Sequence, residues 1–157
     1  NEKTKPSFIN IYNSTMNNLQ STAYYYFNKE YFNEFCDNPH VFLVNVYFQD
    51  KQIASCMIFR YGDKLHYHIG GSFWEYRNMR PNNLIHCSVV KYGINNGFKM
   101  YHLGGGLKDG DSLYDFKCKI ADTMYDYTIY KNVLNSEMYT KITKDVLNKD
   151  YFPAHRQ

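Results

Sequence analysis

Three runs of strand-forming residues follow one another between residues 41 and 69 with almost no chain between them. The runs are Val41 to Phe48, Gln52 to Arg60 and Lys64 to Ile69, and the turn-forming pairs Asp50-Lys51 and Gly62-Asp63 separate them. Connections this short join only antiparallel neighbours, because a parallel pair needs a crossover of about a dozen residues or more. The chain therefore contains a predicted antiparallel meander.

Helical patterns lie on both sides of the meander. Apolar residues recur at helical spacing from about Pro6 to Gln20 and from about Asn28 to Cys36. The aromatic run Tyr24 to Phe27 between them is either a pocket wall or a packing cluster, and we favour packing. After the meander, a helix is predicted from Pro81 to about Asn96, with Gly97 as its C-terminal cap.

A strand, a glycine-rich loop and a helix are predicted in succession between residues 99 and 121. The strand over Met100 to Leu103 runs into three consecutive glycines, Gly104, Gly105 and Gly106. Without Cβ atoms, their backbone adopts positive φ readily and approaches a ligand closely. Ser112 and Asp115 have the spacing of a capping box, which predicts the start of a helix there. The N–H groups at such a start suit an anion or a polarised carbonyl.

The order of the predicted elements specifies a mixed sheet. A further strand is predicted over Tyr125 to Lys131 and a last helix over Ser136 to Asn148. The strand from Lys64, the helix from Pro81 and the strand from Met100 form a right-handed βαβ unit, which makes the two strands parallel. The predicted fold class is α/β of the α+β type, an antiparallel meander followed by a βαβ crossover in a mixed central sheet flanked by helices.

Glycines follow both of the predicted parallel strands. Gly70 and Gly71 follow the first, and Gly104 begins the triplet after the second. Because ligands in such sheets bind beyond the carboxyl ends of the strands, we expect both glycine-bearing ends to meet at a pocket. On the helix after the triplet, Lys117 shares a face with apolar residues and Lys119 does not. Lys117 either stabilises developing negative charge in that pocket or extends its stem past the core to water, and spacing alone favours the second.

The composition is that of a folded globular domain, and we expect a single one over residues 1–157. Hydrophobic residues make up 44% of the chain and charged residues 21%, with a net charge of +3 and no lysine block, so a nucleic-acid footprint is not indicated. No apolar stretch approaches the length of a membrane span, and no signal peptide is apparent. The four cysteines form no CxxC pair, which favours free thiols in a reducing compartment. We therefore expect a cytoplasmic protein, and the sequence does not specify its oligomeric state.

Two histidines lie on the third strand of the meander. Residues two apart on a strand point to the same face, so His66 and His68 are expected on one side of the sheet. The other side then carries Leu65, Tyr67 and Ile69. The pair could bind zinc with His86 or His102 as a third ligand, or His68 could act as a general base near the end of the strand. Ordinary hydrogen bonding is the simplest role, and no metal site is predicted.

The element order resembles that of the GNAT acyltransferases. The stretch from His102 to Gly106 with Asp111 to Lys117 is similar to the carboxy-terminal motif of the Fem-type aminoacyltransferases, in which a strand ending in glycines precedes a leucine-aromatic-x-phenylalanine-lysine helix. Leu65 to Ser72 is similar to that family's tyrosine-rich strand, and Arg80 to Ile85 to the start of its crossover helix. The resemblance spans about residues 8–147. It implies that the chain is one GNAT-like half, the second, of a longer two-domain protein.

The resemblance implies transfer of an acyl or aminoacyl group to an amine. Acyl-CoA or aminoacyl-tRNA would be the co-substrate, and no cofactor would be bound permanently. The acceptor would be an amine-bearing small molecule or a peptidoglycan or polysaccharide precursor, and tRNA is a further possible partner. The alternative is a non-catalytic GNAT-like binding module that supports a partner domain.

Site residues follow from the resemblance and the helix face together. Lys117 is predicted to stabilise the oxyanion or to hold a donor phosphate. The glycine triplet and Ser112 are predicted to bind the donor. Asp111 is predicted either to orient the amine or to cap the helix. The segment from Ser72 to Pro81 lacks the glycine pattern with which acetyl-CoA enzymes hold pyrophosphate. Two kinds of side chain in this segment are then the predicted donor contacts. Arg77 and Arg80 could hold phosphates by charge. Trp74 and Tyr76 could stack on a substrate ring, or they could pack over the sheet as a lid.

Overall fold

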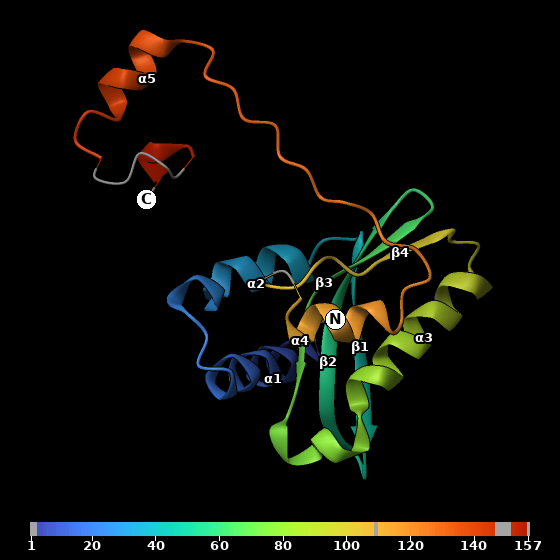
Figure 1. Cartoon of the computed structure of the whole chain (residues 1–157). Coiled ribbons are helices and arrows are strands. Elements are labelled where there is room, and N and C mark those ends of the chain that lie inside the picture. The colour runs from blue at the N-terminus through green and yellow to red at the C-terminus, as the bar shows by residue number, and fades with distance from the viewer. Residues whose placement is uncertain (1–2, 109, 147–151, 157) are drawn as a thin grey trace. The chain divides into compact units, whose positions relative to one another are not determined.

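The computed structural model describes residues 3–108, 110–146 and 152–156. It consists of two compact units, Asn1–Asp122 and Thr123–Gln157, whose positions relative to each other are not determined (Figure 1). In the part of the chain that the structure describes, the helices lack the length and apolar character of a membrane-spanning segment.

The first unit contains one four-stranded sheet in the order β1-β2-β3-β4. Strands β1 (Val41–Phe48), β2 (Lys51–Tyr61) and β3 (Lys64–Ser72) form an antiparallel meander, because only tight turns connect them. The short strand β4 (Met100–His102) pairs with β3 in parallel after the crossover helix α3 (Pro81–Asn95). The predicted meander, crossover and mixed sheet are thus confirmed.

Helices cover both faces of this sheet (Figure 1). Helices α1 (Lys5–Asn18) and α2 (Lys29–Cys36) enclose a core on one face, and α3 encloses another on the opposite face. The neighbouring β2 residues Met57 and Ile58 alternate between these two cores, as adjacent strand residues do. The aromatic run after α1 is mostly a packing feature, since Tyr25 and Phe27 pack on the first core.

The two glycine-bearing strand ends lie at the same edge of the sheet, because β3 and β4 are parallel, but the hydrogen bonds between these strands stop before the glycines. Strand β4 ends at His102 opposite His66, whereas β3 continues to Ser72, so Gly70 and Gly71 lie four and five residues beyond that pairing. Gly71 instead lies against α1, where an added Cβ would be 2.8 Å from Thr15 Cβ. Close packing of a helix on the sheet explains this glycine.

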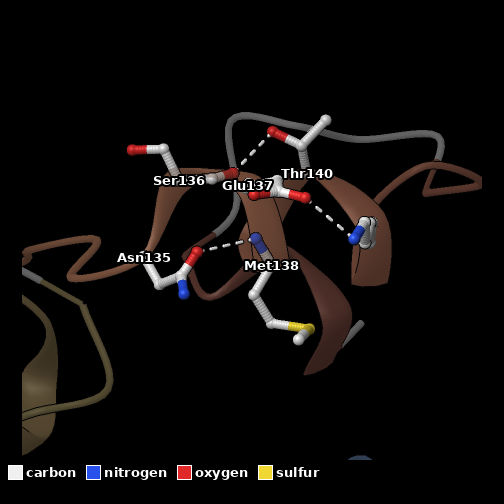
Figure 2. Close-up of polar contacts among 6 residues, drawn as sticks. Asn135, Ser136, Glu137, Met138 and Thr140 are labelled. Carbon is white, nitrogen blue, oxygen red and sulfur yellow. Dashed lines mark hydrogen bonds and ion pairs between the residues drawn. The ribbon is translucent and has the colours of Figure 1, made fainter.

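The second unit contains the short helix α5 (Ser136–Ile142). The Asn135 side chain caps it by accepting a 2.9 Å hydrogen bond from the Met138 backbone N–H, and Glu137 pairs with Lys141 one turn further on (Figure 2). The helix is shorter than predicted, and the last two residues of the predicted range lie outside the described residues.

The predicted strand from Tyr125 to Lys131 is not formed. Its large side chains are mostly exposed, among them Tyr127 and Tyr130 at 88% each. An alternating pattern favours a strand only when another strand supplies hydrogen-bonding partners, and none pairs with this segment in the described residues.

Candidate functional site

The side chain of Lys117 turns inward from helix α4 (Ser112–Cys118) toward the glycine triplet. Its ammonium donates a 2.6 Å hydrogen bond to the Gly105 carbonyl oxygen and lies 5.9 Å from the centre of the Tyr67 ring. Burial lowers the pKa of Lys117, and the nearby Asp111 charge opposes that shift. In the described part of the chain, no carboxylate lies within ion-pair distance of this ammonium. Lys119 is exposed, so the predicted contrast between the two lysines is confirmed.

Asp111 holds the glycine-rich loop against the start of α4. One carboxylate oxygen accepts a 2.7 Å hydrogen bond from the Tyr114 N–H, and the other accepts bonds of 2.6 and 2.9 Å from the N–H groups of Leu107 and Lys108. These backbone bonds lower the pKa of Asp111, so the carboxylate is charged at neutral pH. Gly106 makes room for it, since an added Cβ would be 2.9 Å from the Asp111 carboxyl carbon.

The helix therefore begins with Asp111 as its cap, and Ser112 is the first helical residue. The capping box predicted Ser112 as the cap, which is wrong by one position. The Asp111 carboxylate accepts several backbone N–H groups at once, whereas the serine hydroxyl has fewer acceptor sites. Of the two roles predicted for Asp111, the structure shows the cap. At the start of the triplet, Gly104 adopts a positive φ of 69°, as expected of a glycine there.

A cluster of one histidine and two tyrosines lies beside the lysine, which contacts the Tyr67 ring and acts by its charge on His86. His86 of α3 is buried, and its Nδ1 atom lies 2.9 Å from the Tyr101 hydroxyl of β4. Its ring is also close to the ring of Tyr67 on β3, at 5.1 Å between centroids. Burial, assisted by the Lys117 charge, lowers the pKa of His86 to about 4, so this imidazole is neutral at pH 7. Burial also raises the pKa values of Tyr67 and Tyr101.

Sequence reasoning missed this ring cluster. His86 was considered only as a third zinc ligand, and the two tyrosines only as strand residues. The three residues come from three different elements, so no local spacing signals their meeting. The cluster places Lys117 among neutral groups, where its charge is less screened than in water.

The histidines of β3 lie on one side of the sheet, as predicted, and this is the side that α1 and α2 cover. The Nδ1 atoms of His66 and His102 are 2.8 Å apart, while the His68 ring stacks on Phe59 and its Nε2 atom is hydrogen-bonded to the Tyr31 hydroxyl. Burial lowers the pKa of His68 to about 4. Ile69 lies on this same side, contrary to expectation, because the register of β3 shifts at an irregularity beside it.

Other polar groups do not extend this histidine cluster into a metal site. Across the described ranges, no group of three His, Cys, Asp or Glu side chains is arranged to hold a metal ion.

The predicted phosphate-binding segment forms the 3-10 helix η2 (Trp74–Met79). Arg77 stacks on the Trp74 ring at 4.6 Å and donates a hydrogen bond to the Trp74 carbonyl. Tyr76 packs on the α3-side core, which is the predicted lid packing. Arg80 is exposed, adopts a positive φ of 51° and precedes the first turn of α3. The structure does not bring Arg77 or Trp74 into contact with Lys117.

Two surface grooves lie in this region, one lined largely by α4 and the loop before it and the other largely by α3. The leucine groove, of about 540 Å³, is lined by Leu19, Asn82, Leu107, Lys108, Asp111, Ser112, Leu113 and Phe116. The α3 groove, of about 360 Å³, runs along α3 from Asn83 to Asn95 and is closed by Ile120. Phe116 lines the first groove and His86 the second, and their ring centroids are 5.6 Å apart. The two grooves therefore approach each other at these two rings, and Phe116 directly precedes Lys117 in the chain.

A meander, a parallel crossover and a glycine-ended strand before a lysine-bearing helix together define an α+β domain of the acyltransferase type. Residues 8–117 match the family described as acetyltransferase (GNAT) domain, and the chain belongs to that family. No curated protein matches the chain significantly.

Solved structures of aminoglycoside acetyltransferases share the fold. The enzyme meta-AAC0020 from an uncultured soil metagenomic sample, in complex with trehalose, superposes with a TM-score of 0.64 at 8% identity, over 85% of this chain and 92% of that one. Its complex with sisomicin gives 0.63 at 10% identity, over 86% and 92%. The enzyme HMB0005, also from an uncultured soil metagenomic sample, gives 0.60 at 7%, over 80% and 89%. At such identities the likeness establishes the α+β GNAT fold.

Proposed function

We propose that this protein is an N-acyltransferase that moves an acyl group from a thioester donor to the amine of a small molecule. The observation that carries the proposal is the half-buried Lys117 ammonium, which faces the glycine triplet and has a backbone carbonyl, not a carboxylate, as its partner. An uncompensated charge in a poorly solvated site stabilises developing negative charge strongly. Family membership supports acyl transfer as the reaction.

In the proposed reaction the acceptor nitrogen attacks the thioester carbonyl carbon. The new C–N bond gives a tetrahedral oxyanion, which then breaks the C–S bond, and the thiol leaves with the proton that the amine loses. Lys117 stabilises the oxyanion, and the backbone N–H groups of Gly105 and Gly106 are further candidate donors.

Removal of the amine proton requires a base. His68 keeps its predicted role as a candidate, but its Nε2 atom is engaged by Tyr31. The exposed His102, which forms the Nδ1 pair with His66 close to the Lys117 charge, is better placed for the task.

The donor that we propose is acyl-CoA. Its support is the family, whose description names acetyl transfer, and the exposed Arg80 before α3, which is available for a phosphate. Aminoacyl-tRNA transfer of the Fem type, onto a peptidoglycan or polysaccharide precursor, is the finer alternative. The small net charge of +3 gives it less support, because tRNA binding depends on many phosphate contacts.

A mass-detected transfer assay tests the proposal. The full chain is incubated with acyl-CoA donors of several lengths, or with aminoacyl-tRNA, and with a panel of primary amines. We expect amide products from acyl-CoA and none from aminoacyl-tRNA. Products from aminoacyl-tRNA alone would reassign the donor, and no product from any donor would contradict the proposed activity.

The second candidate is a non-catalytic binding module. It is favoured by the η2 segment, where Arg77 is already occupied by Trp74 and no glycine pattern offers amides to a pyrophosphate. Titration separates the two candidates: acceptor binding without any CoA binding would support the module, whereas CoA binding supports the enzyme.

A further inference from the structure

The leucine groove is an exposed apolar surface beside the Lys117 site. Its leucines come from three separate segments, since Leu19 follows α1, Leu107 lies in the loop after the glycines and Leu113 lies on α4. Their side chains are 62%, 65% and 39% exposed, respectively. Apolar side chains that gather around one groove while exposed to water mark a binding surface.

The groove adjoins the proposed reaction centre. Phe116, which lines it, is half-buried, contacts His86 and directly precedes Lys117 in the chain. A volume of about 540 Å³ lies within the range of small-molecule sites, and an acetyl group alone would leave most of it empty.

The charges of the groove disfavour a cationic occupant. Among the described residues that line the groove, Asp111 is the one carboxylate, and both of its oxygens already accept backbone N–H groups. Lys108 adds a positive charge, and Asn82 and Ser112 are neutral. Among the described lining residues, an acceptor rich in ammonium groups would meet a single carboxylate that already accepts three backbone N–H groups, and the Lys108 charge offsets that carboxylate.

We propose that the leucine groove binds the aliphatic acyl chain of the donor, so that the substrate class is a medium-chain acyl thioester rather than acetyl-CoA. This proposal rests on the proposed function, because it assigns the groove to the donor of that reaction. Methylene groups need no hydrogen bonds, which suits a lining of leucine and phenylalanine. Each buried methylene contributes about 0.8 kcal/mol, or about fourfold in affinity.

Calorimetric binding of acetyl-CoA and octanoyl-CoA to the full chain tests the assignment without requiring turnover. We expect octanoyl-CoA to bind more than about tenfold tighter, since several methylenes become buried. Leu113→Trp or Leu107→Trp fills the groove and should abolish this difference in affinity between the two thioesters. Leu84→Trp is the matched control, because Leu84 is an exposed leucine of α3 that lines neither groove.

The outcomes separate the two proposals. Three results would overturn the assignment of the groove, even if acetyl transfer is observed. They are equal affinity for the two thioesters, a preference for octanoyl-CoA that survives both groove variants, and displacement of octanoyl-CoA by sisomicin. A different result would support the groove assignment and overturn the proposed function. In that result, affinity depends on acyl-chain length, the groove variants remove this dependence, and no acyl group is transferred to any amine.

Discussion

The Lys117 ammonium donates its 2.6 Å hydrogen bond to the carbonyl oxygen of Gly105, twelve positions earlier in the chain. This bond joins the last turn of α4 to the loop that follows β4. A carbonyl accepts the bond but does not neutralise the charge, so the ammonium keeps most of its field for an anionic partner. The position of the lysine therefore depends on the shape of the loop, which Asp111 maintains.

Replacing Asp111 with Ala is expected to destabilise the fold by about 1–2 kcal/mol, because it removes a helix cap and leaves the loop N–H groups of Leu107 and Lys108 without their acceptor. Urea unfolding measures the change. Asp115→Ala, on the first turn of the same helix, is the control and should cost less than about 0.5 kcal/mol. Equal effects of the two changes would contradict the capping role.

Replacing Gly71 with Ala is expected to cost about 1–3 kcal/mol, because the new methyl group would overlap Thr15 of α1. Gly105→Ala is the matched control, since an added Cβ there meets nothing within 4 Å. Thermal unfolding of the two variants gives the comparison. If both variants are as stable as the parent, the close packing of α1 on β3 is wrong.

The buried His86 is expected to make stability depend on pH. Its pKa falls from an ordinary value of about 6.5 to about 4 in the folded protein, so between these values the unfolded chain binds a proton that the folded chain does not. The stabilisation is complete above about pH 6.5 and is lost as the pH falls through 4, by an amount on the order of 3 kcal/mol.

Urea unfolding between pH 7 and pH 4 tests this expectation. His86→Phe should remove the His86 part of this pH dependence and leave the part that His68 contributes, although it lowers stability at pH 7 by leaving the Tyr101 hydroxyl without its partner. Exchange of the exposed His40 for Gln should leave the dependence unchanged. A variant at His86 that keeps the full slope would show that other groups control it.

Local signals in the sequence predicted most of the first unit. Turn pairs and alternation defined β1 to β3, helical spacing and Pro81 defined α3, and the predicted Gly97 cap does adopt a positive φ of 75°. These features depend on neighbours within a few residues. That His66 and His68 lie on the same side of the sheet followed from the same local rule.

The features that the sequence could not predict depend on contacts between residues far apart in the chain. The segment after α4 has the alternation of a strand but pairs with none in the described residues, and β4 ends early, so Gly70 lies beyond its reach. The meeting of Tyr67, His86 and Tyr101 depends on the register of β3 with β4 and on the rotation of α3. Neither property is encoded in a short motif.

The central claim is that the Lys117 ammonium stabilises the transition state of acyl transfer. The single-turnover rate of amide formation from a saturating acyl-CoA, compared between the parent and Lys117→Met, tests it most directly, with Lys119→Met as the control. We expect Lys117→Met to lower this rate by about 10²–10³-fold while the free energy of unfolding changes by less than about 1 kcal/mol, and Lys119→Met to change neither. A parental rate in Lys117→Met, or a loss of rate fully explained by unfolding, would contradict the claim.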